Sequence, residues 1–120
     1  MPVIKVYSQS IEPELKAVIA KKLSAEAEAH LQVSTVQVIF IDLDRIYGKD
    51  EREHCLLEME GPAKTPEVIE SLGKALCSVF LQESGRSRCN VSAVYHENRP
   101  DLVITLEGSL ENRRKSRNSG

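Results

Sequence analysis

The chain has 120 residues, the length of one domain, and its hydrophobic (41%) and charged (28%) fractions are ordinary for a globular protein. A formal net charge of −2 and the absence of tryptophan argue against a nucleic-acid-binding surface, which needs basic and stacking side chains. No apolar run approaches the ~20 residues that span a bilayer, and the start lacks a basic and then apolar leader, so we expect a cytoplasmic protein without membrane or nucleic-acid partners.

The first half of the chain reads as strand, helix, strand. Residues 2–7 are apolar and β-branched, which predicts a strand. Ser10 is a candidate helix cap, and Pro13 fits the first turn of the helix that follows. Residues 35–42 form the clearest strand. Because they are apolar on both faces, we expect this strand to lie in the centre of a sheet.

The second half repeats this order after a charged loop over residues 43–53. Residues 54–60 predict a strand, and Thr65 and Pro66 open a helix that Gly85 ends. Residues 89–95 alternate as a strand, and residues 102–106 predict a short final strand. Residues 1–110 are therefore expected to form one domain, and residues 111–120 a disordered basic tail.

Two β-α-β units with right-handed crossovers predict an α+β fold, a four-stranded mixed sheet with two helices on one face. The other face of that sheet would be bare although its strands are apolar on both parities. A second copy of the chain is the natural cover, so we expect a homo-oligomer.

The cysteines and histidines do not predict a metal or cofactor site. Cys55, Cys77 and Cys89 are an odd number without a Cys-x-x-Cys pair, which favours reduced thiols in a core over a disulfide framework or a zinc site. The three histidines, at positions 30, 54 and 96, lack metal-ligand spacing. We therefore expect no cofactor and no bound metal.

Pro2 is the most informative residue of the chain. Because it is small, we expect Met1 to be removed, which would leave Pro2 with a free secondary amine at the start of a strand. Such an amine is a compact base and nucleophile held by a ring. The alternative is that Pro2 merely starts an edge strand, where a missing N–H does no harm.

A proline amine on the first strand of a doubled β-α-β chain resembles the tautomerase superfamily, which includes 4-oxalocrotonate tautomerase and macrophage migration inhibitory factor. The matching segments are Pro2-Val3-Ile4, residues 36–42 with the loop that holds Tyr47-Gly48, and residues 55–59 with the turn that ends at Lys64. The resemblance implies a homotrimer in which Pro2 is the acid and base of keto-enol tautomerisation of a small 2-oxo acid.

The usual anion-binding arginines of that family are missing here. The corresponding positions are close to Ser10 and Gln37. Arg45, Lys64 and Arg99 are candidate replacements for binding a substrate carboxylate, and Lys64 is the best candidate because the matching turn approaches the proline pocket in the family. Tyr95 is a further candidate substrate-binding residue.

Three functions follow from these observations. The first is a tautomerase that acts on a small-molecule substrate. The second is a non-catalytic trimeric scaffold or small-molecule-binding protein, which the missing arginines favour. The third is a ferredoxin-like RNA-binding module, against which the few aromatic residues and the net charge argue.

Overall fold

The computed structural model describes residues 2–49, 52–86, 88–102, 104–109 and 111. The elements of the first unit are β1 (Val3–Gln9), α1 (Pro13–Leu31) and β2 (Gln37–Leu43). Those of the second unit are β3 (His54–Gly61), α2 (Pro66–Ser84) and β4 (Asn90–Glu97). A 3-10 helix, η1 (Pro100–Leu102), and two short strands, β5 (Ile104–Thr105) and β6 (Gly108–Ser109), follow.

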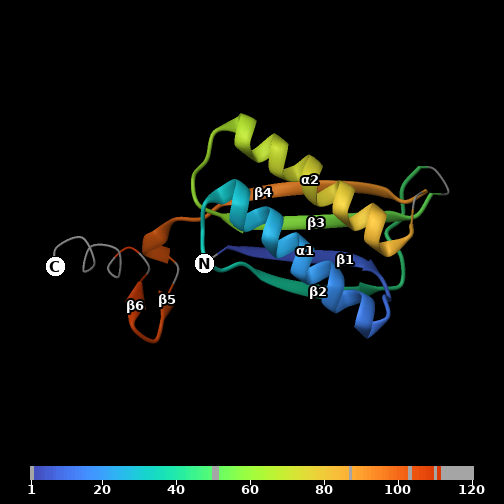
Figure 1. Ribbon diagram of the computed structural model, residues 1–120, viewed down its shortest axis with the longest axis horizontal. Coiled ribbons are helices and arrows are strands. Elements are labelled where there is room, and N and C mark those ends of the chain that lie inside the picture. Colours follow the sequence, from blue (N-terminus) through green and yellow to red (C-terminus); the bar gives the residue numbers. More distant parts are fainter. Residues whose placement is uncertain (1, 50–51, 87, 103, 110, 112–120) are drawn as a thin grey trace.

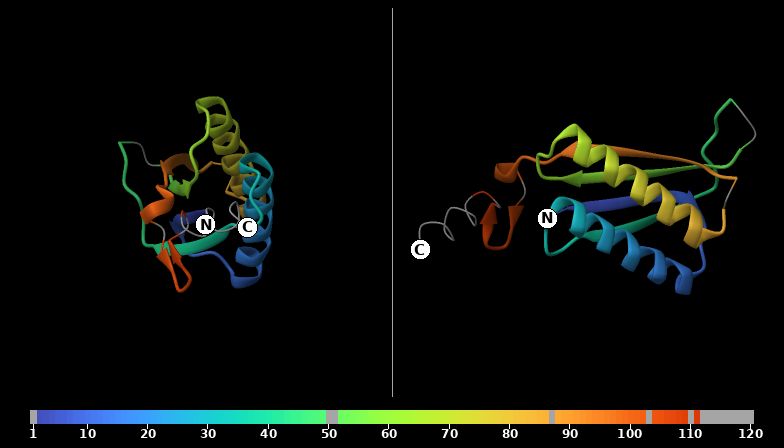
Figure 2. Two further views of the ribbon diagram at one scale, coloured as in Figure 1. Left: turned by 90° about the vertical axis from the view of Figure 1, so that its left-hand side faces the viewer. Right: turned by 45° about the horizontal axis from the view of Figure 1, so that its top comes forward.

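The main sheet has the strand order β2-β1-β3-β4. Each unit contributes a parallel pair, and the two units meet along the antiparallel pair β1–β3. Both helices lie on one face of this sheet, as the views of Figures 1 and 2 show. The predicted α+β fold, a four-stranded mixed sheet with two helices on one face, is therefore confirmed.

Strands β5 and β6 form a separate two-stranded ribbon beside the start of β1 (Figure 1). The final strand expected over residues 102–106 is thus only partly right, because a 3-10 turn precedes a strand of two residues that does not join the main sheet. The predicted tail lies almost entirely outside the described residues, which end at Glu111.

Local chemistry explains where the helices begin and end. The Thr65 hydroxyl accepts a hydrogen bond from the Val68 N–H at 3.3 Å, and Gly85 ends α2 with φ 69°, both as predicted. The prediction that Ser10 caps α1 is wrong. Glu12 takes the cap position without a side-chain hydrogen bond, and Pro13 follows it as the first helical residue, where its missing N–H has no cost.

The core fills the space between the sheet and the two helices. Alternate residues of β1 and β3 face the helices and are buried, as the strand period of two requires. They meet the apolar stripes of the helices. The largest fully buried core side chains are Ile4, Val6, Ile19, Leu23, Leu57, Leu72, Leu76 and Phe80.

The predicted central position of residues 35–42 is wrong, because β2 is an edge strand. The face of the sheet opposite the helices, called the open face below, is also less apolar than expected. In its centre Lys5 lies 3.8 Å from carboxylate oxygens of both Glu58 and Glu60. Apolar side chains lie toward its edges, where Ile39 and Val94 are about two-fifths exposed. An apolar strand can therefore sit at an edge of this sheet while the centre of the same face carries ion pairs.

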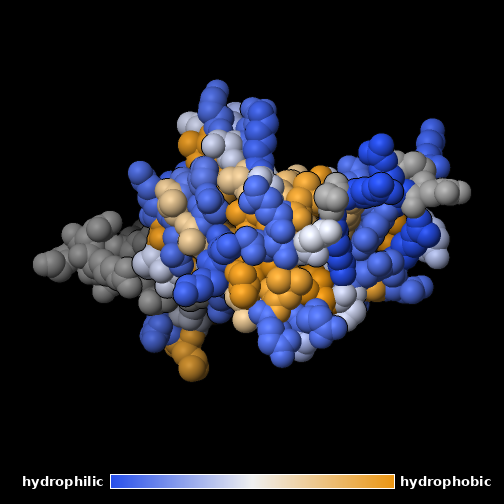
Figure 3. All heavy atoms as spheres, turned by 45° about the vertical axis from the view of Figure 1, so that its right-hand side comes forward, coloured by the Kyte–Doolittle hydropathy of each residue, from blue (hydrophilic) through white to orange (hydrophobic). Residues whose placement is uncertain are grey.

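The surface leaves some apolar groups uncovered. Figure 3 shows apolar side chains gathered near the middle of one side of the molecule, with hydrophilic side chains between and around them. Leu106, in the turn between β5 and β6, is fully exposed. Among the described residues, neither long helix has a stretch apolar enough to cross a membrane.

Candidate active site at the Pro2 end of the sheet

Pro2 is buried at the start of β1. Its carbonyl accepts a hydrogen bond from the Gln37 N–H at 3.1 Å, which extends the pairing of β1 with β2. The antiparallel register pairs Val3 with Glu60, so one step further Pro2 faces Gly61. A Cβ added to Gly61 would lie 2.5 Å from the Tyr95 hydroxyl oxygen, so any larger residue here would have to displace that hydroxyl.

The strand directions bring two loops to the Pro2 end. Because β1 runs against β3 and β4, the start of β1 meets the segments that follow β3 and β4 (Figure 1). The Asn98 N–H donates to the Gly61 carbonyl at 2.6 Å and so ties these two segments together. Lys64 lies in the first segment and Arg99 in the second.

Lys64 is partly exposed in the turn between β3 and α2. Among the described residues it makes no hydrogen bond or ion pair. Its positive charge is therefore not neutralised within that part of the chain, which leaves it available to an anionic ligand.

Arg99 reaches the same end of the sheet from the other side. It lines an open groove of about 690 Å³ together with Val3, Gln37 and Glu60, which belong to the open face. Pro2, by contrast, precedes Ile4 by two residues and therefore lies on the side of the sheet that faces the helices. Arg99 is also paired with Asp101 through two contacts of 3.2 and 2.7 Å. This ion pair partly neutralises the Arg99 charge, and Nη1 makes no contact with Asp101.

Tyr95 has a hydrogen-bond partner already. Its hydroxyl donates to the Pro62 carbonyl at 2.5 Å, and burial, with a smaller contribution from Glu97, raises its pKa to about 12. The bond holds the turn that carries Lys64. Sequence reasoning proposed Tyr95 as a ligand-binding residue and missed this contact, for which Gly61 was the available signal.

Arg45 lies in the loop that follows β2 (Figure 1). Within one chain this loop is at the end of the sheet opposite Pro2. Its guanidinium lies 5.4 Å from the centre of the Tyr47 ring. The resemblance implies arginines at two positions. Gln37 occupies the first, at the end of the sheet where Pro2 lies, and Ser10 occupies the second, at the opposite end, where Arg45 lies. The structure thus brings Pro2, Lys64, Tyr95 and Arg99 to one end and leaves Arg45 at the other.

No protein-family profile matches the sequence, and no curated protein matches it either. Solved structures do match. A fused 4-OT described as a wild-type symmetric trimer has a TM-score of 0.76 and 19% identity, and the match covers 91% of this chain and 96% of the other. For the macrophage migration inhibitory factor of Toxoplasma gondii the values are 0.77 and 10%, over 89% and 98%.

A third structure, Pt0534 inactivated by 2-oxo-3-pentynoate, has a TM-score of 0.72 and 14% identity over 92% of this chain and 98% of the other. The chain therefore has the fold of the 4-OT and migration-inhibitory-factor structures over most of its length. The resemblance to the tautomerase superfamily is confirmed at the level of the fold.

Proposed function

We propose that the chain belongs functionally to the tautomerase superfamily and, after removal of Met1, catalyses keto-enol tautomerisation of a small 2-oxo acid with the Pro2 nitrogen as acid and base. The observation that carries the proposal is the buried position of Pro2 at the end of the sheet where Lys64 lies without a partner among the described residues. A fold shared with 4-OT supports it.

The proposed chemistry needs a neutral amine near pH 7. Burial disfavours the charged form of an amine and lowers its pKa, which counters the high basicity of a secondary amine. The neutral Pro2 nitrogen removes a proton from the carbon next to the carbonyl, and an enolate forms. The protonated amine then returns that proton to the enolate oxygen, or to another carbon of a conjugated acid. Lys64 binds the substrate carboxylate throughout.

A reactive 2-oxo acid tests the site directly. Pt0534 is described as inactivated by 2-oxo-3-pentynoate, whose triple bond is conjugated to the carbonyl and so accepts a nucleophile. We expect one equivalent to alkylate the Pro2 nitrogen of protein shown by intact mass to begin at Pro2. Peptide mapping locates the adduct. The matched control keeps one extra residue before Pro2, which makes that nitrogen an amide, and should stay unlabelled. Labelling elsewhere in both proteins would contradict the proposal.

We also propose that the chain is a homotrimer. Within the described parts of the chain no helix covers the open face, the ribbon exposes Leu106, and a structural neighbour is described as a symmetric trimer. Sedimentation at micromolar concentration should give three times the chain mass of 13.4 kDa. A clean monomer at that concentration would contradict this assembly.

A second candidate function is a non-catalytic trimeric scaffold or small-molecule-binding protein. Ser10 and Gln37 favour it, because they replace the arginines that the resemblance implies. Retention of Met1 in the native host would also favour it, since the Pro2 nitrogen would then have no basicity. Calorimetric binding of a 2-oxo acid without turnover by protein that begins at Pro2 would support this function over the first.

The expected location and partners follow the same proposal. We place the protein in the cytoplasm, with a small molecule and its own copies as partners and neither nucleic acid nor membrane. The net charge of −2 supports this, because it provides no general attraction to phosphate backbones or anionic lipid.

A further inference from the structure

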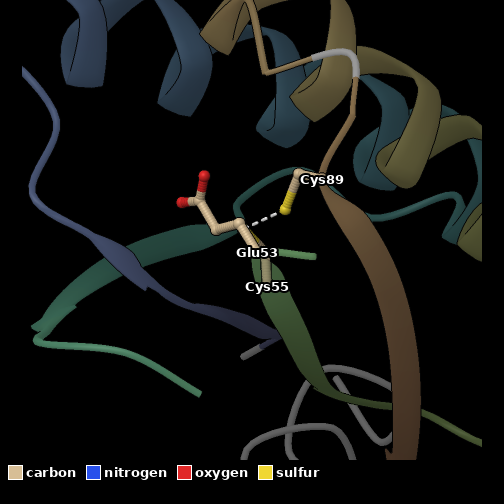
Figure 4. Close-up of side chains that lie close together, drawn as sticks. All are labelled: Glu53, Cys55 and Cys89. Atoms are coloured by element: carbon tan, nitrogen blue, oxygen red, sulfur yellow. Dashed lines mark hydrogen bonds between the residues drawn. The ribbon is translucent and has the colours of Figure 1, made fainter. Parts of the chain in front are cut away.

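Two buried thiols meet at the end of the sheet opposite Pro2, where β3 and β4 begin. Figure 4 shows them together with Glu53. Cys55 lies on β3 and Cys89 directly precedes β4, and their side chains are 1% and 9% exposed. Their sulfur atoms lie 2.7 Å apart although the residues are 34 positions apart in the sequence. The register brings them together, because β3 and β4 pair in parallel from His54 and Asn90 onward.

A metal ion is the first explanation to consider for this cluster, because the Glu53 carboxylate lies within 4.8 Å of both sulfurs. Two observations argue against it. The Arg86 guanidinium binds the Glu53 carboxylate at 2.9 Å, so the negative charge that would attract a metal ion is already neutralised. Two sulfurs at ~2.3 Å from one tetrahedral zinc ion are about 3.8 Å apart, well beyond the observed spacing.

The Arg86 guanidinium also forms hydrogen bonds with two backbone carbonyls. It donates to the Gln9 carbonyl at 3.2 Å and to the Ser10 carbonyl at 2.8 Å. A metal ion would have to displace this clamp, whereas a sulfur–sulfur bond leaves it in place. The sulfurs need only close from 2.7 Å to the ~2.05 Å of a disulfide.

We propose that Cys55 and Cys89 form a reversible disulfide, with a hydroperoxide as the oxidant. One thiolate attacks the peroxide oxygen and becomes a sulfenic acid, and one water leaves when the oxidant is hydrogen peroxide. The second thiol then attacks that sulfur, and a second water leaves. Two S–H bonds break, one S–S bond forms, and the two electrons reduce the peroxide.

The surroundings make this reaction slow at neutral pH. Burial raises the pKa of both thiols, with further increases from the Glu53 carboxylate, while the Arg86 charge lowers them. Because the thiolate is the nucleophile, the rate of oxidation should rise as the pH rises. Cys77 provides a control, since its pKa is also raised by burial but it lies on α2 beside β4, away from the pair.

Peptide mapping tests the proposal without any variant. Trypsin cleavage after Arg52, Lys74 and Arg88 puts each cysteine on a separate peptide. After peroxide treatment of the native protein and maleimide blocking, we expect a Cys55–Cys89 cross-linked peptide, one blocked thiol on Cys77, and full reversal by dithiothreitol. The Cys77→Ser variant should form the same cross-link at the same rate.

Two results would overturn the proposal. One is the persistence of three blockable thiols, or a cross-link that includes Cys77 or joins two chains. The other is stoichiometric binding of added Zn²⁺ or Cd²⁺ to the reduced protein that the Cys89→Ser variant loses, because it would assign the cluster to a metal. The test does not depend on tautomerase activity.

Discussion

Each β-α-β unit has a corner where its two parallel strands begin. The two corners share a backbone hydrogen bond but differ in the side chains around it. In the first unit the carbonyl of Pro2, which precedes β1, accepts the Gln37 N–H at 3.1 Å; in the second the carbonyl of Glu53, which precedes β3, accepts the Asn90 N–H at 2.7 Å. Pro2 and Glu53 thus occupy equivalent positions of the internal repeat.

What surrounds these two positions differs. Around Glu53 the polar groups are satisfied by the Arg86 clamp, and the remaining space holds two thiols. Around Pro2 a lysine stays unpaired within the described residues, and a groove opens beside the first strand. One corner of the doubled fold is thus closed by an internal ion pair, while the other combines a groove with a lysine that has no partner among the described residues, as the proposed function requires.

Replacing the proposed base should have the largest effect. Pro2→Ala should lower the rate of ketonisation of a phenylpyruvate-type enol or a 2-hydroxydienoate by on the order of 10²–10⁴-fold, the usual contribution of a positioned acid–base group. Ultraviolet absorbance follows the reaction, and unchanged sedimentation and thermal unfolding serve as the control. Equal rates for both proteins would contradict the proposal that the Pro2 corner, unlike the Glu53 corner, is catalytic.

The Lys64→Ala variant should show the next largest effect. Losing one charge-assisted contact should cost about 1.5–3 kcal/mol, or about ten- to a hundredfold in kcat/KM for a carboxylate substrate, mainly through KM. Arg45→Ala is the matched control at the opposite end of the sheet and should be silent. A loss in Arg99→Ala but not in Lys64→Ala would mean that the groove on the open face holds the carboxylate.

Arg86→Ala should separate stability from activity. It removes the guanidinium that binds the Gln9 and Ser10 carbonyls and leaves the Glu53 carboxylate unpaired. We expect a loss of about 1–3 kcal/mol in the free energy of unfolding by urea, with kcat/KM of the folded protein unchanged. A selective loss of activity would place the ligand at this corner instead.

Tyr95→Phe should have the smallest effect, and one that depends on pH. The loss at pH 8 should be about 0.5–1.5 kcal/mol, the net contribution of one hydrogen bond. Because the folded pKa of about 12 lies above the ordinary value near ~10, the hydroxyl's contribution is complete below pH 10 and disappears as the pH rises through 12. Urea midpoints of both proteins from pH 8 upward should converge, and a constant difference would contradict this role.

The local signals in the sequence predicted most of the fold. Thr65, Pro66 and Gly85 mark the ends of α2 because their own chemistry determines them. The edge position of β2 could not be predicted, since a run that is apolar on both parities is also typical of a central strand. Ser10 failed as a cap because Pro13 sets the start of α1 three residues later.

The candidate site was harder to predict. The resemblance to the tautomerase superfamily predicted that Lys64 lies near Pro2, and the antiparallel pairing of β1 with β3 brings both residues to the same end of the sheet. The ion pair of Arg99 with Asp101 and the bond from Tyr95 to Pro62 depend on side-chain geometry that no spacing encodes. The contact of Cys55 with Cys89 depends on the register of β3 and β4, which sequence reasoning did not set.

The edge position of β2 has a consequence for handling the protein. Residues 38–41, Val-Ile-Phe-Ile, form an uncharged apolar run on an edge strand. The outward N–H and C=O groups of this strand pair with no other strand of the described sheet, so an extended chain can pair with them. Asp42, held 2.9 Å from Lys16, supplies charge only where this run ends. We therefore expect aggregation of the dilute or partly unfolded chain to begin at β2, so that a charged gatekeeper residue in this run would improve its recovery on refolding.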